Sequence, residues 1–247
     1  MRPVFADPRT DFVFKTIFGT EANKPLLIAL LDDLLERDEA HRIAQVELLS
    51  PEQRPKLNEL KYSIVDVKCV DARGTTYVVE MQVLNVEGFE KRVVYNVAKA
   101  YTSQLGPGEP YPDLNDVIGI TICDFELWPQ KEWDVPLLSR WRTQEQHTGR
   151  TGLPEIQFVF LELPKLDMSR PPETVIEKWA YFFRKAAKLT EVPPELSQGP
   201  YANALDAART ARFTDEEWDD YIFLSIGDEH QVSFEARAHR SAQAFKG

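Results

Sequence analysis

Residues 62–85, YSIVDVKCVDARGTTYVVEMQVLN, contain the pattern that decides the fold. On both sides of a central turn, apolar side chains occupy every second position, which is typical of β-strands with one buried face. A three-residue loop at 72–74, with Gly74 in the left-handed conformation, places Asp71 opposite Thr75. The segment is therefore predicted to be an antiparallel β-hairpin.

This register sorts the side chains of the hairpin onto two faces. One face is polar, with Asp66 directly opposite Glu80, and it contains Asp66, Lys68, Glu80 and Gln82. The other face is apolar and contains Val65, Val67, Cys69, Val79, Met81 and Val83. A slip of one residue would turn the apolar face toward water, so burial fixes the register strongly.

The opposed carboxylates of Asp66 and Glu80 are candidate metal ligands. Like charges directly opposite on a hairpin destabilise it, and a divalent cation removes that repulsion. Mg²⁺ takes one or two protein carboxylates and fills its remaining positions with water and substrate phosphate. The alternative is a solvated outer face on which Lys68 neutralises Asp66.

Further elements are predicted on either side of the hairpin. Two helices precede it, at about 10–19 and 21–37, with a strand at 42–50, and a helix at 89–104 follows it. Strands are predicted at 116–128, 132–145 and 155–163, and helices after Pro171 and Pro172. We therefore expect an α/β or α+β core over 1–168 and a helical extension over 169–247, whose aromatic residues pack on the core or form a dimer surface.

Composition limits the class of protein. Hydrophobic residues make up 43% of the 247 residues, enough for a sizeable core. No apolar run of about 18–20 residues predicts a membrane span, and the N-terminus does not resemble a secretory signal. Two isolated cysteines fit a reduced, cytoplasmic compartment.

Net charge and missing motifs narrow the function. The formal net charge of −11 argues against tight non-specific binding to nucleic acid, so any basic surface must be local. The sequence has no Gly-rich phosphate loop, so no nucleotide cofactor is expected. It also lacks a G-x-S-x-G elbow, and its four histidines lack metal-ligand spacing.

Several motifs occur together in a fixed order over residues 7–166. They are Asp7-Pro8, Asp11-Phe12-Val13-Phe14-Lys15, Ile17-Phe18-Gly19, Asp66-Val67-Lys68, Val79-Glu80-Met81-Gln82-Val83, Lys91-Arg92 with Tyr95, Tyr101 and Gln104, Asp124-Phe125, and Leu161-Glu162-Leu163-Pro164. In these motifs and their order, the chain resembles the recombination-promoting nuclease / putative transposase family of the PD-(D/E)xK nuclease superfamily.

The resemblance implies a restriction-endonuclease-like core, a mixed central sheet flanked by helices, and metal-dependent endonucleolytic cleavage of DNA linked to recombination or mobile elements. It implies Asp66 and Glu80 as ligands of Mg²⁺, with Mn²⁺ as a substitute. Gln82 occupies the position of the motif's lysine. An amide supplies no charge but orients water or ligates metal through its carbonyl oxygen, so the charge role passes to Lys68, Lys91 or Arg92.

The helix after the hairpin is a candidate nucleic-acid surface. Arg92, Tyr95 and Lys99 lie on one helical face, where the cations can contact phosphate and the tyrosine can stack. The alternative is that this helical face is only solvated, with a half-buried tyrosine. Cutting both strands would require two sites, as in a homodimer. The competing function is a catalytically weak binding or assembly module with the same fold, which the net charge and Gln82 favour.

Overall fold

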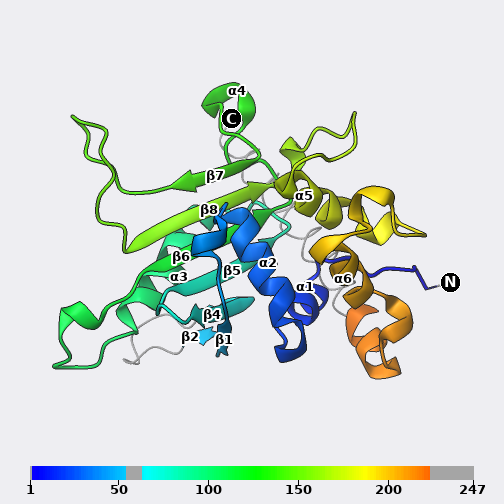
Figure 1. Cartoon of the computed structure of the whole chain (residues 1–247), viewed down its shortest axis with the longest axis horizontal. Helices are drawn as coiled ribbons and strands as arrows, with labels where there is room; N and C mark the ends of the chain where they lie inside the picture. The colour runs from blue at the N-terminus through cyan, green and yellow to red at the C-terminus, as the bar shows by residue number, and fades with distance from the viewer. Residues whose placement is uncertain (1, 54–62, 223–247) are drawn as a thin grey trace, which may run out of the picture.

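A six-stranded mixed sheet forms the centre of the molecule (Figure 1), in a computed structural model that describes residues 2–53 and 63–222. The strands, in spatial order, are β1 (Val46–Leu49), β4 (Val67–Asp71), β5 (Thr76–Gln82), β6 (Val117–Cys123), β8 (Ile156–Glu162) and β7 (Leu138–Trp141). Neighbours β5, β6 and β8 run parallel, and the other pairs are antiparallel. The short strands β2 (Glu52–Gln53) and β3 (Ser63–Ile64) pair separately.

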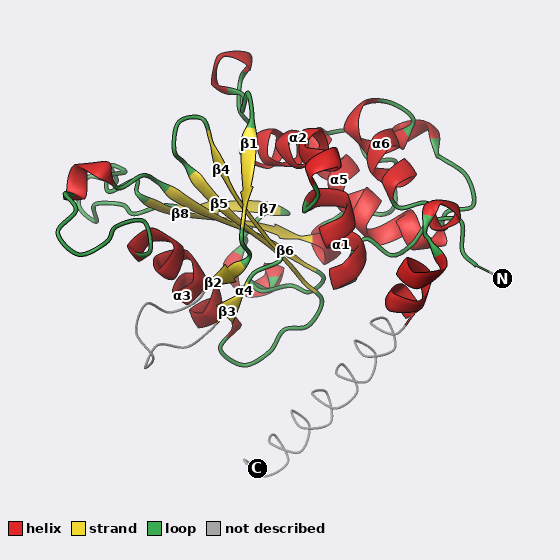
Figure 2. Cartoon of the chain, turned by 90° about the horizontal axis from the view of Figure 1, so that it is seen from below, coloured by secondary structure: helices red, strands yellow, loops and turns green. Residues whose placement is uncertain are grey.

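Helices cover both faces of the sheet (Figure 2). On one face lie α1 (Asp11–Phe18), α2 (Lys24–Leu34) and α5 (Val175–Lys185), with α6 (Gly199–Ala207) packed on them. On the other face lies α3 (Phe89–Thr102), the crossover between the parallel strands β5 and β6. This arrangement confirms the predicted fold class.

The main hydrophobic core lies between the sheet and the first set of helices. Its aromatic residues come from both ends of the chain: the ring centroids of Phe18 and Trp179 are 6.0 Å apart, and those of Phe14 and Phe183 are 6.1 Å apart. Trp179, Phe182 and Phe183 are therefore core residues.

The predicted domain boundary between residues 168 and 169 stays a prediction. No helix in the described ranges is long and apolar enough to cross a membrane.

The predicted hairpin register is confirmed within β4 and β5, with Val67 opposite Val79 and Lys68 opposite Val78. The paired ladder ends at Val67 and Val79, so the predicted direct pairing of Asp66 with Glu80 is not formed. Gly74 has φ +87°, and a Cβ atom there would lie 2.6 Å from the Asn115 side-chain oxygen, so the turn requires glycine.

The extent of the hairpin's apolar face is predicted wrongly at both ends. The chain bends at Asp66, before β4 begins, and Val65 packs with Val78 on the α3 side. Val83 lies beyond the end of β5 and is 36% exposed. Alternation therefore holds only within the paired part of the hairpin.

Residues 132–145 were predicted to form one strand, and this prediction is wrong. A short helix, α4 (Gln130–Trp133), comes first and ends at Asp134, which has φ +48°. Pro136, which has no N–H to donate, follows before β7 begins at Leu138.

Candidate active site

Strand β5 presents Glu80 and Gln82 to helix α3. Successive strand side chains point to opposite faces. Tyr77, Val79 and Met81 belong to the main core, so the even-numbered residues face α3. Glu80 is 8% exposed. The polar face of the hairpin is thus covered by a helix, which contradicts the alternative of a solvated outer face.

Asp66 lies where the ladder between β4 and β5 ends. Its Oδ2 accepts a hydrogen bond of 2.7 Å from the backbone N–H of Met81. The paired residues end at Val67 and Val79, so a side-chain carboxylate takes the place of a backbone acceptor. This contact fixes one oxygen of Asp66 beside the residue that follows Glu80.

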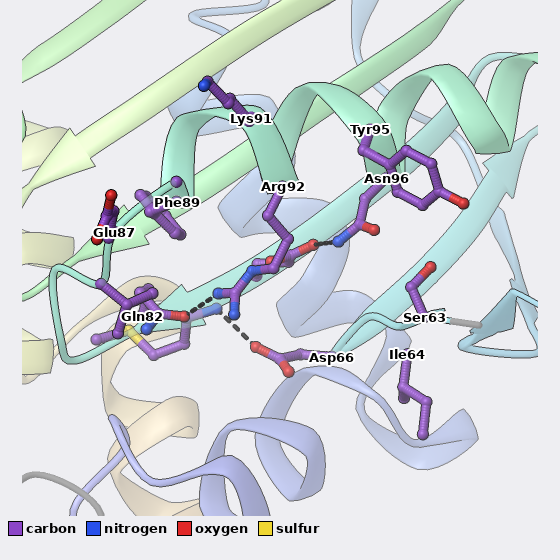
Figure 3. Close-up of a pocket in the computed structure, with 14 residues that line it drawn as sticks. Ser63, Ile64, Asp66, Gln82, Glu87, Phe89, Lys91, Arg92, Tyr95 and Asn96 are labelled. Atoms are coloured by element: carbon purple, nitrogen blue, oxygen red, sulfur yellow. Dashed lines mark hydrogen bonds between the residues drawn. The ribbon is translucent and has the colours of Figure 1, made fainter. Parts of the chain in front are cut away.

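The two carboxylates line one open pocket of about 740 Å³. Gln82, Arg92 and Asn96 line the same pocket. In Figure 3, Arg92 extends from α3 toward Gln82 and Asp66, and its Nη2 donates a hydrogen bond to Oε1 of Gln82. The residues of the resemblance motif, Asp66 and Glu80-x-Gln82, are thereby brought together from both strands of the hairpin.

Asn96 is a site residue that the sequence analysis missed. Its Nδ2 donates a 2.7 Å hydrogen bond to Oε1 of Glu80, and the residue is 2% exposed. Its Oδ1 is buried without a hydrogen-bond partner among the described residues. Asn96 interrupts the buried stripe of α3, otherwise Phe89, Val93, Val97 and Ala100. A polar residue in such a stripe needs a buried hydrogen-bond partner, and this break in the apolar pattern is the feature of the sequence that could have identified Asn96.

Burial raises the pKa of both carboxyl groups. Burial raises the pKa of Asp66 to about 7, opposed by the Met81 N–H and reinforced by the charge of Glu80. Burial also raises the pKa of Glu80, opposed by the hydrogen bond from Asn96 and by the charge of Arg92. A pair of buried carboxylates with raised pKa values gains from a bound cation.

Asp66→Asn is expected to stabilise the metal-free protein at high pH and not at low pH. Because the folded-state pKa of Asp66 lies above its ordinary value of 3.8, this group costs stability as pH rises from about 4 to about 7. The asparagine variant lacks that cost, so it should exceed the wild type in stability by up to about 4 kcal/mol at pH 8 and match it near pH 4. Urea unfolding in EDTA at both pH values measures the difference. Parallel pH dependences for the two proteins would contradict this assignment.

Two other predicted site residues lie outside the pocket lining. Lys68 lies opposite Val78, is half-buried, and burial lowers its pKa. Lys99 is at the edge, with Nζ 3.4 Å from Oγ of Ser63 and 5.6 Å from the ring centroid of Tyr95. Tyr95 does line the pocket. The structure therefore places Arg92, rather than Lys68, beside the carboxylates.

An ion-pair network supports the strand end that bears Gln82. Arg9 bridges Asp7 at 2.7 Å and Asp124 at 2.6 Å, and both carboxylates help raise the pKa of the Arg9 guanidinium. The backbone N–H of Asp124 donates a 2.9 Å hydrogen bond to the carbonyl of Gln82. The N-terminal turn is thus tied to the end of β6, beside the pocket.

The donor set fits a divalent cation that keeps much of its water. In the parts of the chain that the structure describes, no group of three or more His, Cys, Asp or Glu side chains is placed to hold a metal ion. Mg²⁺ needs one or two carboxylates and completes its shell with water and phosphate. Asp66 and Glu80 meet this need, and the unpartnered Oδ1 of Asn96 is an acceptor for water.

A family model described as PD-(D/E)XK nuclease family transposase matches residues 8–223. The chain belongs to this family. Membership in the PD-(D/E)XK nuclease family transposases agrees with the mixed sheet between two layers of helices and supports a nuclease or transposase-like role. The match extends beyond residue 168 through α5 and α6. No curated protein and no solved structure matches the chain.

Proposed function

We propose that the protein is a Mg²⁺-dependent endonuclease that hydrolyses phosphodiester bonds in DNA, with Mn²⁺ as an alternative ion, and that it acts in recombination or on mobile elements. The observation that carries the proposal is the convergence of Asp66 and Glu80 on one pocket. Family membership supports the reaction class. A homodimer would supply two pockets for cutting both strands.

Asp66 and Glu80 would hold the metal ion. When bound, such an ion polarises the phosphodiester and lowers the pKa of a water molecule. The Met81 N–H fixes the Asp66 carboxylate, and Asn96 fixes that of Glu80. Both ligands are thus oriented before substrate arrives, which reduces the cost of assembling the site.

Gln82 and Arg92 would act on the substrate. The Gln82 amide accepts from Arg92 and, through Nε2, donates to the carbonyl of Leu84. In our proposal Gln82 orients the attacking water through its carbonyl oxygen, and the Arg92 guanidinium stabilises charge on the phosphate. Arg92 replaces the charge that the motif's lysine would supply.

Arg92→Gln is expected to lower the cleavage rate by about 10²-fold, because one charge-stabilising donor is typically worth that much in kcat. Single-turnover cleavage at saturating protein measures the effect. Lys68→Gln is the matched control and should retain most of the rate, since Lys68 lies outside the pocket lining. The reverse order of effects would assign the charge role to Lys68.

The second candidate function is a nuclease-fold module that binds or assembles without efficient cleavage. Two observations favour it: the uncharged Gln82 at the lysine position, and a net charge of −11. This second function requires that the pocket does not cleave DNA efficiently even when metal is present.

Cleavage of supercoiled plasmid separates the two candidates. Purified full-length protein is incubated with Mg²⁺, Mn²⁺ or EDTA, and nicked and linear products are quantified. The endonuclease is expected to nick or linearise the plasmid with either metal and not in EDTA. Absence of cleavage with both metals would leave the binding module.

A further inference from the structure

One end of the pocket has a lining that the proposed reaction does not use. In Figure 3, Arg92 and Gln82 lie toward one end, and Tyr95, Ser63 and Ile64 lie at the other. Tyr95 is 36% exposed and Ile64 is 55% exposed. Exposed aromatic and apolar side chains on a pocket wall favour a ligand with a flat apolar surface.

Positive charge lies on both sides of this apolar end. Lys99 approaches the Tyr95 ring, 5.6 Å from its centroid. Arg92 is seven residues earlier on α3, which is about 10 Å along the helix axis. An aromatic platform between two cations suits a nucleotide, since a base stacks on the ring while its flanking phosphates meet the charges.

We propose that Tyr95, Ile64 and Ser63 form a subsite for one unpaired base next to the scissile phosphate. The inference rests on the proposed function and names its substrate class: DNA that is single-stranded or locally unpaired at the cleavage position. The pocket, about 740 Å³, is of the size that holds a drug-sized molecule, ~300–1,000 Å³. One nucleotide fits such a space, and its base can stack on the Tyr95 ring only when it is unstacked from a duplex.

The charge of the chain makes stacking the main source of affinity. Lys91 and Arg92 line the pocket and Lys99 lies at its edge, and the net charge of −11 opposes a wider phosphate footprint. Three phosphate contacts to a single strand give a slope of about −2 for log affinity against log salt. Binding should therefore weaken modestly with salt and strongly when the ring is removed.

Fluorescence anisotropy with a labelled DNA strand tests the subsite. The protein is the full-length Asp66→Asn variant in Mg²⁺, and the probes are a single strand of about 12 nucleotides, within the ~4–16 typical of such sites, and its blunt duplex. We expect the single strand to bind about tenfold tighter or more. Tyr95→Ala in this background should weaken single-strand binding by about 5- to 100-fold, and Tyr95→Phe should preserve it.

Two further variants keep the test decisive. Tyr111→Ala removes a tyrosine that is 83% exposed and lies outside the pocket lining, and it should leave binding unchanged. Ile64→Glu, at an exposed position, should weaken single-strand binding by repelling the strand. Equal binding of strand and duplex, or unchanged binding in both Tyr95→Ala and Ile64→Glu, would overturn the subsite. Because this assay needs no cleavage, an inactive wild type would remove the nuclease claim alone.

Discussion

Glu80→Gln is expected to reduce DNA cleavage by about 10³-fold or more while the chain stays folded. The charge stabilisation supplied by a bound metal is worth several kcal/mol, and each 1.36 kcal/mol is tenfold in rate. Glutamine keeps the shape of Glu80 and can still accept the hydrogen bond that Asn96 donates to Oε1. The comparison is the initial rate of plasmid nicking in Mg²⁺ at equal protein concentration.

The control for this prediction is a charge removal elsewhere. Glu47→Gln alters an exposed residue of the edge strand β1 and should leave the nicking rate unchanged. Circular dichroism and the unfolding midpoint confirm that both variants are folded. If Glu80→Gln retained more than about a tenth of the wild-type rate, Glu80 would not be a metal ligand for the reaction.

Glu162→Ala is expected to destabilise the protein by about 3–5 kcal/mol, because it leaves a buried charge unpaired. Glu162 is fully buried, and its Oε1 lies 2.8 Å from Nζ of Lys165, which is itself nearly buried. Its Oε2 accepts hydrogen bonds from the backbone N–H groups of Leu127 and Trp128 at 2.7 and 3.1 Å. One side chain thus satisfies groups from two chain segments.

Urea unfolding at neutral pH measures this loss as a lower midpoint at constant slope. Glu21→Ala is the matched control, since it removes an exposed partner of Lys24, and exposed pairs contribute little. A loss below about 1 kcal/mol for Glu162→Ala would show that the Glu162–Lys165 pair is dispensable.

The sequence sufficed to predict the hairpin and the family. Alternating apolar residues and Gly74 fixed the register, because a shift by one residue would expose the whole buried face. Alternation could not reveal that α3 covers the polar face, since that contact depends on the crossover between β5 and β6. The bend at Asp66, which turns Val65 away from Val67, likewise depends on a tertiary contact with Met81.

The sequence predicted the carboxyl groups that line the pocket and missed the side chains that hold them in place. Asp66, Glu80 and Gln82 follow from strand periodicity together with the resemblance, and they line one pocket. Asn96 and Arg9 act through partners far away in sequence, Glu80 and Asp124, and no local pattern specifies those pairings. Which cation, Lys68 or Arg92, lies beside the carboxyl groups also depends on where helix α3 packs on the sheet.

Titration of Mn²⁺ or Mg²⁺ into the metal-free protein tests the central claim, that Asp66 and Glu80 form one metal site, most directly. Isothermal calorimetry is run at pH 8 on the wild type, Asp66→Asn, Glu80→Gln and the control Lys68→Gln, with a short DNA strand present to complete the shell. We predict metal binding to the wild type and to Lys68→Gln. In Asp66→Asn and Glu80→Gln we predict a metal affinity that is lower by at least about tenfold, because the loss of a group that merely supports a metal ligand already costs that much. Wild-type affinity in both Asp66→Asn and Glu80→Gln would contradict the account.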